Sequence, residues 1–254
     1  MNTMNLKSRS LLNDETVLSF HLVGKRKAQE DALFVSEDKR LLIVCDGVGG
    51  NKRGDLASSI VCSHIGKLYK DNHGTVNHDF FVECIHSAKT ELDSQVHQDF
   101  SLEGLATTIA MVYIGVDHIL TFHVGDSRIV YIDKSNKKVW ASKDHSIVQE
   151  LLDNGILQDQ KDALTHPLRN RVTRVVQGTG SNTKKKLKVS TSKIKSIHED
   201  DILILCTDGV LENLTSIDLA KRFGKGNTIE QWQDLELFCN DESQDNATAL
   251  LFEF

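Results

Sequence analysis

Short apolar segments rich in β-branched residues recur along the chain, and turn-forming residues bound each of them. Segments of this length and composition are typical of strands that lie buried in a sheet. The pattern predicts strands over residues 16–23, 41–45, 107–114, 119–124, 129–132, 202–206 and 247–254.

Two other segments place apolar residues at the spacing of one helix face, from Leu56 to Leu68 and from Phe80 to Val96. Because strands and helices come in runs and do not alternate strictly, their order favours an α+β architecture. Antiparallel sheets covered by helix pairs are expected, in place of a doubly wound parallel sheet. Three shorter helices are predicted over residues 146–154, 216–223 and 229–238.

The composition is that of one globular domain. Of the 254 residues, 39% are apolar and 26% are charged, so the chain can bury a sizeable core and keep a solvated surface. With one proline and no tract that would form a long linker, residues 1–254 are expected to form a single domain. The segment 156–177, which contains the proline, is interpreted as an ordered surface excursion, or flap.

Charge and cysteine content indicate which partners and which cellular location the protein is expected to have. A net charge of -6 gives no general attraction to nucleic acid or to anionic membranes. No apolar run approaches the roughly 18 residues that span a bilayer, so we expect no membrane segment and a cytoplasmic location. The five cysteines are scattered without metal-ligand spacing, which favours reduced, buried thiols. The basic run Lys184, Lys185, Lys186 and Lys188 is interpreted as a solvated turn, with contact to acidic partners as the alternative.

Four aspartates stand at the ends of predicted strands. Asp46, Asp126 and Asp208 each follow an apolar run, and Asp245 comes just before the last one. A carboxylate that is partly desolvated in this way is costly unless a cation or hydrogen-bond donors compensate it. Oxygen ligands without thiolate or imidazole select magnesium, manganese or calcium over zinc or copper, and of these magnesium or manganese is expected. Together the four aspartates predict a cation site.

Glycines beside these aspartates strengthen the prediction. Without a side chain, Gly47 lets the backbone approach a metal and offer its carbonyl oxygen, and the pair Gly49 and Gly50 permits a tight turn. Two hard cations about 4 Å apart, bridged by a carboxylate and a water, lower the pKa of that water and supply a nucleophile at neutral pH. Hydrolysis of phosphoesters is the use that such a centre indicates.

The sequence around these residues resembles the metal-dependent serine/threonine protein phosphatases, the PPM or type 2C family, and in particular its bacterial members. The resemblance extends over about residues 20–254 and is carried by seven motifs in the family's order. They are RKAQED (26–31), DGVGG (46–50), GLATT (104–108), VGDSR (124–128), KDHS (143–146), CTDGV (206–210) and DNAT (245–248).

The resemblance implies a four-layer αββα sandwich, with two central antiparallel sheets flanked by helix pairs and a metal site at one end. Asp46 would bridge two principal magnesium or manganese ions, Gly47 would add its carbonyl oxygen, and further ligands would come from Asp208 and Asp245. A third ion would lie between Asp126 and Asp208. The flap would influence the choice of substrate.

The resemblance also assigns catalytic roles. Arg26 matches the arginine that binds the substrate phosphate, and Asp31 matches the acid that assists the metal site. A water bridging the metals would attack phosphorus directly, so no covalent enzyme intermediate would form. Histidine as a residue type titrates near neutrality, which makes His145 and His166 candidates for acid/base chemistry, but His145 is expected to order the turn at Asp144, and His166 to face solvent.

Two departures from the family pattern bear on the chemistry. Gln29 stands where the family usually has asparagine, and its extra methylene would shift the hydrogen bonds around Asp31. Val48 replaces the histidine that animal members carry, so that general acid is absent here, as is common in bacterial members.

The sequence therefore indicates a monomeric cytoplasmic phosphatase that hydrolyses phosphoserine and phosphothreonine in proteins and opposes a serine/threonine kinase. A first alternative is a non-catalytic regulatory module of the same fold that binds phosphoproteins. A second is a two-metal phosphomonoesterase that acts on small molecules. The retained aspartates argue against the first alternative, because loss of a ligand is the expected mark of such a module.

Overall fold

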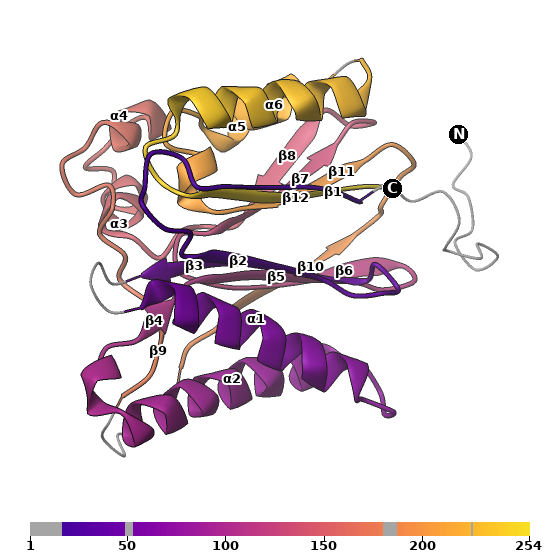
Figure 1. The fold of residues 1–254 in the computed structure, drawn as a ribbon. Helices are drawn as coiled ribbons and strands as arrows, with labels where there is room; N and C mark the ends of the chain where they lie inside the picture. Colours follow the sequence, from indigo (N-terminus) through magenta and orange to yellow (C-terminus); the bar gives the residue numbers. More distant parts are fainter. Residues whose placement is uncertain (1–16, 49–52, 180–186, 225) are drawn as a thin grey trace.

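The computed structural model describes residues 17–48, 53–179, 187–224 and 226–254. Two antiparallel sheets lie face to face, and helices cover the outer face of each, so the described chain forms four layers (Figure 1). The α+β sandwich expected from the sequence is therefore confirmed. Gly49, Gly50 and the lysines at 184–186 lie outside the described residues.

The first sheet has the strand order β1-β12-β11-β7-β8, with all neighbours antiparallel. Its central strands are buried on both faces, which explains their continuous apolar runs. The strands are β1 (Val17–Leu22), β7 (Arg128–Asp133), β8 (Lys138–Ala141), β11 (Ile202–Cys206) and β12 (Ala247–Glu253).

The second sheet has the order β10-β6-β5-β3-β4-β9, and β2 pairs with β3 beside this path. The predicted strand 107–114 is divided into β4 and β5 at Thr108, whose N–H donates to Asp46 O at 2.8 Å. The strands are β2 (Asp31–Val35), β3 (Leu41–Val48), β4 (Ala106–Thr107), β5 (Ile109–Ile114), β6 (His118–Val124), β9 (Val176–Gln177) and β10 (Ser190–Lys195).

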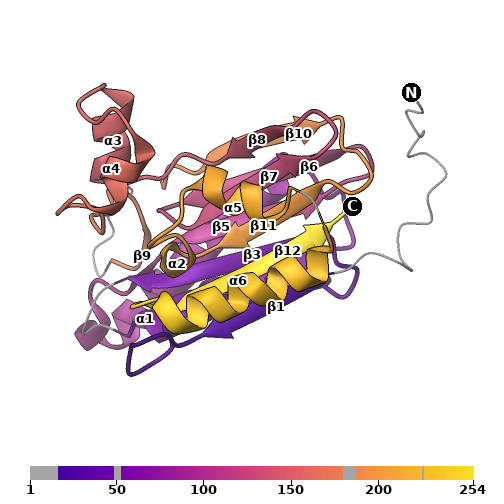
Figure 2. The same cartoon turned by 90° about the horizontal axis from the view of Figure 1, so that it is seen from above.

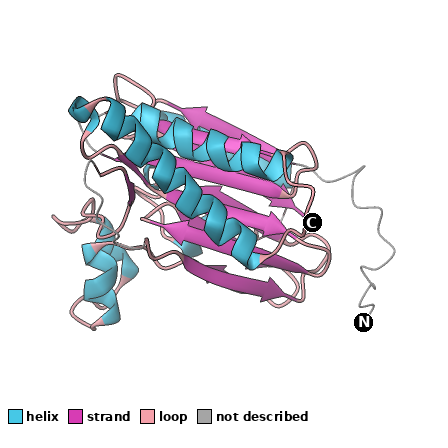
Figure 3. Cartoon of the chain, turned by 90° about the horizontal axis from the view of Figure 1, so that it is seen from below, coloured by secondary structure: helices cyan, strands magenta, loops and turns pink. Residues whose placement is uncertain are grey.

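The two long predicted helices, α1 (Gly54–Lys70) and α2 (His78–Gln98), cover the second sheet, as seen from below in Figure 3. Their apolar stripes pack on it around Ile65, Phe81 and Phe122. Asp55 lies in the first turn of α1, whereas the N-cap is Arg53. The short helix η2 (Phe100–Leu102) follows α2.

Helices α5 (Ser216–Arg222) and α6 (Thr228–Glu242) cover the first sheet, as Figure 2 shows from above. Trp232, Leu235 and Phe223 are buried between them and the sheet. A separate cluster that includes Leu205 fills the space between the two sheets. Each layer is thus held to the next by its own apolar core.

Helices α3 (Ile147–Asp153) and α4 (Gln160–Leu164) project from one end of the sandwich (Figure 2). The base of this excursion is closed by a bridge between Ser146 and Val172. The last two residues of the predicted flap, 176–177, belong to β9 and not to the excursion.

Four strands were not predicted from the sequence: β2, β8, β9 and β10. β2 begins with a carboxylate, β8 and β9 have only four and two residues, and the edge strand β10 consists mostly of exposed polar residues. Short or polar segments of this kind give a weak sequence pattern. Within the described residues, no helix is long and apolar enough to cross a membrane. All five cysteines are free and buried, as the sequence predicted.

Candidate active site at one end of the sandwich

Two of the predicted site aspartates meet because β2 and β3 are antiparallel neighbours. The register pairs Asp31, the first residue of β2, with Asp46 near the end of β3. Residues paired in this way project from the same face of a sheet, with Cα atoms about 4.5–5.5 Å apart. The pairing therefore brings together two carboxylates that are distant in sequence.

The facing sheet contributes Asp208, which follows β11, and Asp245, which precedes β12. Since β11 and β12 are antiparallel neighbours, the end of one lies beside the start of the other. Thr207 joins the two sheets here: its N–H donates to Thr248 O at 3.0 Å, and its hydroxyl donates to Asp31 Oδ2 at 2.9 Å. The acidic strand ends of both sheets thus meet at one end of the sandwich.

The carboxyl groups at this end of the sandwich raise one another's pKa. Burial raises the pKa of Asp46 well above its usual range, and the charges of Asp208 and Asp31 raise it further. Burial and then the charge of Asp245 raise the pKa of Asp208 to about 6. Burial also raises the pKa of Asp31 and that of Asp126, and Asp208 adds to both. Each carboxylate is destabilised by its neighbours, a pattern that marks functional sites.

Asp126 lies in the turn between β6 and β7, and its side chain is buried. Gly125 precedes it with a φ of +107°, and a Cβ there would lie 2.6 Å from Thr108 Cβ. The turn is closed by His145, whose Nδ1 accepts the Gly125 N–H at 3.0 Å. Burial lowers the pKa of His145 to about 3, so the ring stays neutral and acts on the turn at Gly125, whereas the sequence predicted the turn at Asp144. His166 lies on the flap, where its Nδ1 accepts the N–H of the residue at 168.

Gly47 is required by close packing of the chain. A Cβ at this position would lie 2.3 Å from the carbonyl carbon of Gly54, and one at Gly54 would lie 2.7 Å from Gly47 O. The end of β3 therefore touches the start of α1 through two residues without side chains. This contact fixes where the Gly47 carbonyl lies, next to Asp46.

Arg26 lies in the loop between β1 and β2, where its Nη2 donates to Asp245 Oδ2 at 2.5 Å. The loop packs closely against the backbone at Asp245. Gly24, with a φ of +61°, comes so close that a Cβ there would lie 2.1 Å from Asp245 O. The structure thus places the predicted phosphate-binding arginine beside one of the predicted metal ligands.

Three functional positions were missed by sequence reasoning. The buried side chain of Asn246 donates to Val23 O at 2.8 Å and to Ala28 O at 2.9 Å, and accepts the Glu30 N–H at 2.8 Å. It therefore holds the Arg26 loop in place. Glu30 itself borders the site, since burial raises its pKa and the carboxylate accepts the Gly54 N–H. The available signal in the sequence was that Asn246 follows Asp245 and Glu30 precedes Asp31 within the motifs.

The third missed position is Thr108, in the GLATT motif. Its hydroxyl accepts the Asp46 N–H at 3.0 Å and lies 2.6 Å from Ser127 Oγ. Thr107 adds a hydroxyl hydrogen bond to Asp46 O at 2.8 Å. The two threonines therefore fix the backbone of Asp46 and connect it to the turn that carries Asp126.

Gln29 is accommodated without loss of contact to Asp31. Its Oε1 accepts the Asp31 N–H at 3.0 Å, and its Nε2 donates to Leu22 O at 3.0 Å. The longer side chain therefore joins the end of β1 to the start of β2.

The donor set of this site fits a hard divalent cation. Within the described residues, Asp31 Oδ1 and Asp208 Oδ1 are buried without a hydrogen-bond partner. Such oxygens are costly to bury, and a cation with oxygen ligands offsets that cost. Asp245 is turned toward Arg26, and the site aspartates do not form a set of three with all ligand atoms within 4.8 Å of one another.

Within the described part of the chain, the group that meets that spacing is Asp133, His198 and Asp201. It lies at the opposite end of the first sheet, where β7 ends at Asp133 and β11 begins after Asp201. The Asp201 carboxylate already accepts the Tyr131 hydroxyl and the backbone N–H groups of Lys134 and His198. Its contacts are those of a structural carboxylate that ties two loops together.

This fold, with its acidic end, defines the class of the PPM phosphatases. The chain belongs to the protein phosphatase 2C family, whose model matches residues 21–236. Among curated relatives, the serine/threonine phosphatase stp of Listeria innocua is 25% identical over 228 residues, which cover 87% of each chain. The protein phosphatase PhpP of Streptococcus pneumoniae is 28% identical over 184 residues, 71% of each chain.

Solved structures agree in fold. The serine/threonine phosphatase Stp1 of Staphylococcus aureus superposes with a TM-score of 0.83 at 25% identity, over 96% of both chains. The catalytic domain of the phosphatase PstP, crystallised with two manganese ions, has a TM-score of 0.79 at 20% identity, over 94% of this chain and 97% of that one.

Proposed function

We propose that the protein is a metal-dependent phosphatase that removes phosphate from phosphoserine and phosphothreonine side chains of proteins. The observation that carries the proposal is the meeting of Asp31, Asp46, Asp208 and Asp245, from the ends of both sheets, in a member of the protein phosphatase 2C family. Curated relatives that are named serine/threonine phosphatases support the same substrate class.

Two principal magnesium or manganese ions would be held by Asp46, Asp208, Asp245 and the carbonyl oxygen of Gly47. A third would lie between Asp126 and Asp208. Hard oxygen donors suit these cations, and the PstP catalytic domain, a neighbour in fold, was crystallised with two manganese ions. When bound, such ions supply Lewis-acid charge and lower the pKa of water.

The remaining work falls to residues of the chain. The planar guanidinium of Arg26 would bind two phosphate oxygens, which suits its fork of donors. It now donates to Asp245 Oδ2, and a phosphate offers it oxygens of the same kind with more negative charge. Asp31, fixed by the Thr207 hydroxyl, would orient the attacking water beside Asp46.

We also propose a bacterial setting in which the protein acts as a cytoplasmic monomer and opposes a serine/threonine kinase. The curated relatives named above come from bacteria. Five free, buried cysteines fit a reducing compartment.

The test is an assay with a phosphothreonine peptide, p-nitrophenyl phosphate and a nucleic-acid diester, each with manganese, with magnesium and with EDTA. Peptide turnover that EDTA abolishes is the expected result. Turnover of p-nitrophenyl phosphate without turnover of the peptide would instead indicate a small-molecule phosphomonoesterase. Silence on all three substrates, with retained binding of the phosphopeptide, would indicate the regulatory module.

A further inference from the structure

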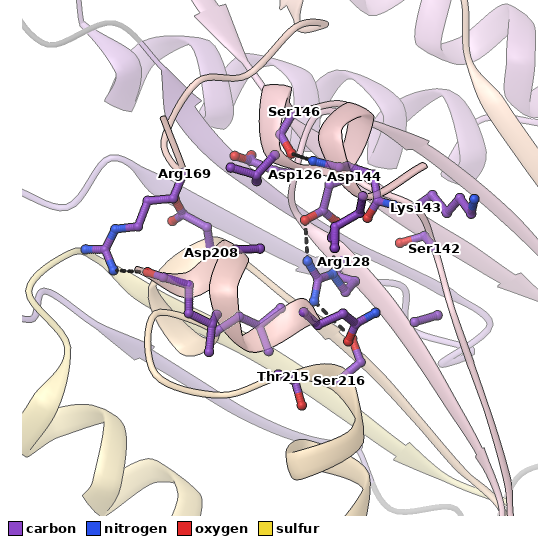
Figure 4. Close-up of a pocket in the computed structure, with 18 of the residues that line it drawn as sticks. Asp126, Arg128, Ser142, Lys143, Asp144, Ser146, Arg169, Asp208, Thr215 and Ser216 are labelled. Carbon is purple, nitrogen blue, oxygen red and sulfur yellow. Dashed lines mark hydrogen bonds and ion pairs between the residues drawn. The ribbon is translucent and has the colours of Figure 1, made fainter. Parts of the chain in front are cut away.

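A cleft of about 370 Å³ opens beside the candidate metal centre, between the flap and the segment from η3 (Asp208–Val210) to α5. Asp126 and Asp208 line one end of it (Figure 4). A substrate whose phosphate is bound at the strand-end aspartates would therefore have part of its chain in this cleft. Its volume lies within the roughly 300–1,000 Å³ typical of ligand sites.

The charged side chains on the floor of the cleft neutralise one another. Arg128 donates to Asp144 Oδ1 from Nε at 2.9 Å and makes a second bond to the same carboxylate from Nη2. Its Nη1 donates to Ser216 Oγ at 3.0 Å. The fork of Arg128 is thus used by the protein itself (Figure 4), and the floor offers no free charge to a ligand.

The charged side chains at the rim are also engaged. Lys143 Nζ lies 2.7 Å from Asp153 Oδ1, and Glu212 Oε2 accepts a backbone N–H at 2.7 Å. Arg169 donates from Nη1 to Leu164 O at 2.9 Å. Apart from the two aspartates at the metal end, every acidic or basic residue that lines the cleft therefore has a partner within the described chain.

Beyond the metal end, the cleft offers apolar surface interspersed with uncharged polar side chains such as Gln149, Gln160 and Asn170. Side chains from β8, α3, the flap and the η3–α5 segment form its walls, and Ile217 on α5 is 53% exposed at its edge. Exposed apolar surface of this kind gains free energy when another apolar group covers it. The apolar wall residues include Val139, Val148, Leu152, Leu164, Leu211 and Ile217.

We propose that this cleft receives an apolar side chain of the phosphoprotein, located within a few residues of the phosphorylated serine or threonine. The inference rests on the proposed function, because it is the phosphate at the aspartates that places the substrate chain in the cleft. An extended peptide advances about 3.3 Å per residue, so a neighbouring side chain reaches the apolar wall. The preferred substrates are then phosphopeptides with leucine, isoleucine or valine at that position.

The test uses phosphothreonine peptides that differ only by leucine or aspartate at one position, scanned over the three residues on each side of the phosphothreonine. At the position that enters the cleft, we expect kcat/KM to favour leucine by at least about tenfold, mainly through KM, since burial of a leucine side chain is worth roughly 1.5–3 kcal/mol.

Two variants locate the preference. Ile217→Asp is expected to abolish the preference for leucine, and Ile217→Ala to weaken it. The matched control is Ile229→Asp, which changes an isoleucine that is 49% exposed at the same second position of α6. Aspartate is favourable in the first turn of a helix, so both variants should fold, and the control should keep the preference.

The outcomes separate the two proposals. Absence of EDTA-sensitive hydrolysis of every peptide would overturn the proposed function and this inference with it. Hydrolysis of all peptides at equal rates by the wild-type protein would overturn the apolar subsite alone. The apolar subsite would also be overturned if Ile217→Asp kept the leucine preference, or if Ile229→Asp lost the preference to the same extent.

Discussion

Asp208 follows a buried strand and begins a short helical turn, with one buried carboxylate oxygen that lacks a hydrogen-bond partner within the described residues. Burial and the nearby charge of Asp245 raise its pKa to about 6. A carboxylate in this setting costs stability in the folded protein. Its presence there makes sense if its negative charge is used, and a bound cation is the use that the site indicates.

Asp208→Asn keeps the size of this side chain and removes its charge. We expect the turnover of a phosphothreonine peptide to fall by more than the ~10–100-fold that loss of an outer partner of a metal ligand costs. The fold should be retained, because Asp208 contributes charge to the site and no apolar contact to the core. Steady-state kinetics with manganese and circular dichroism measure the two effects.

The matched control is Asp234→Asn on the outer helix α6, where the side chain is exposed. This variant should turn over the peptide at the wild-type rate. Wild-type rates in Asp208→Asn would remove Asp208 from the centre.

At the scale of the elements, the Arg26 loop depends on the side chain of Asn246, the residue just before β12. Asn246, which is 3% exposed, satisfies three backbone groups of the loop between β1 and β2. Because Asp245 is its immediate neighbour, the same short segment sets the position of a predicted ligand and that of the predicted phosphate-binding arginine.

Asn246→Ala should therefore affect stability and substrate binding together. Loss of the partners of three backbone groups is expected to lower the free energy of unfolding by about 2–4 kcal/mol. A loosened loop should raise KM for the peptide more than it lowers kcat. Urea denaturation and peptide kinetics test this, with the exposed Asn240→Ala on α6 as the control. An unchanged KM in a destabilised Asn246→Ala would show that the loop is held in some other way.

The elements that could be predicted from the sequence are those buried on both faces or along a full stripe. β11 and β12 consist of nearly continuous buried apolar residues, and α2 has a full helical stripe. The edge strands β8 and β10 bury little: β8 has only four residues, and the sequence of β10 is polar like that of a loop. β2 was not predicted for another reason: its first residue, Asp31, was interpreted only as a site residue and not as the start of a strand.

The part of the site that could be predicted from the sequence is the set of charged residues at the ends of strands. Asp46, Asp208 and Asp245 were expected to lie together as metal ligands, which stays a prediction. The pairing of β2 with β3 and of β11 with β12 brings the strand ends that carry them to one end of the sandwich. Asn246 and Thr108 could not be found in this way. Their roles depend on hydrogen bonds to backbone groups far away in the sequence, and no local pattern records such contacts.

At the scale of the whole molecule, the mutual repulsion of the buried site aspartates makes the stability of the protein depend on pH. For Asp208 the folded-state pKa, about 6, exceeds the ordinary value of 3.8. Between these two pH values the folded state binds more protons than the unfolded state. The stability that protonated Asp208 contributes to the folded state is therefore fully present below pH ~4 and is lost as pH rises through 6. A bound cation should cancel the loss by pairing with the ionised form.

We therefore expect the EDTA-treated wild-type protein to lose stability relative to Asp208→Asn as pH rises from 4.5 to 7.5. The change over this pH range should be about 2 kcal/mol, or roughly 4–8 °C in Tm. Comparison with the variant removes the effects of other titrating groups. Magnesium or manganese should raise the wild-type Tm at pH 7.5 more than at pH 4.5. A difference between the two proteins that is independent of pH would contradict this account.

The central claim is that aspartates from the ends of both sheets hold a pair of divalent ions. Anomalous diffraction from a crystal grown with manganese tests it most directly. We predict two strong peaks with the carboxylate oxygens of Asp46, Asp208 and Asp245 at roughly 2.0–2.4 Å, and Arg26 released from Asp245. The absence of peaks among these oxygens, with Arg26 still bound to Asp245, would contradict the claim.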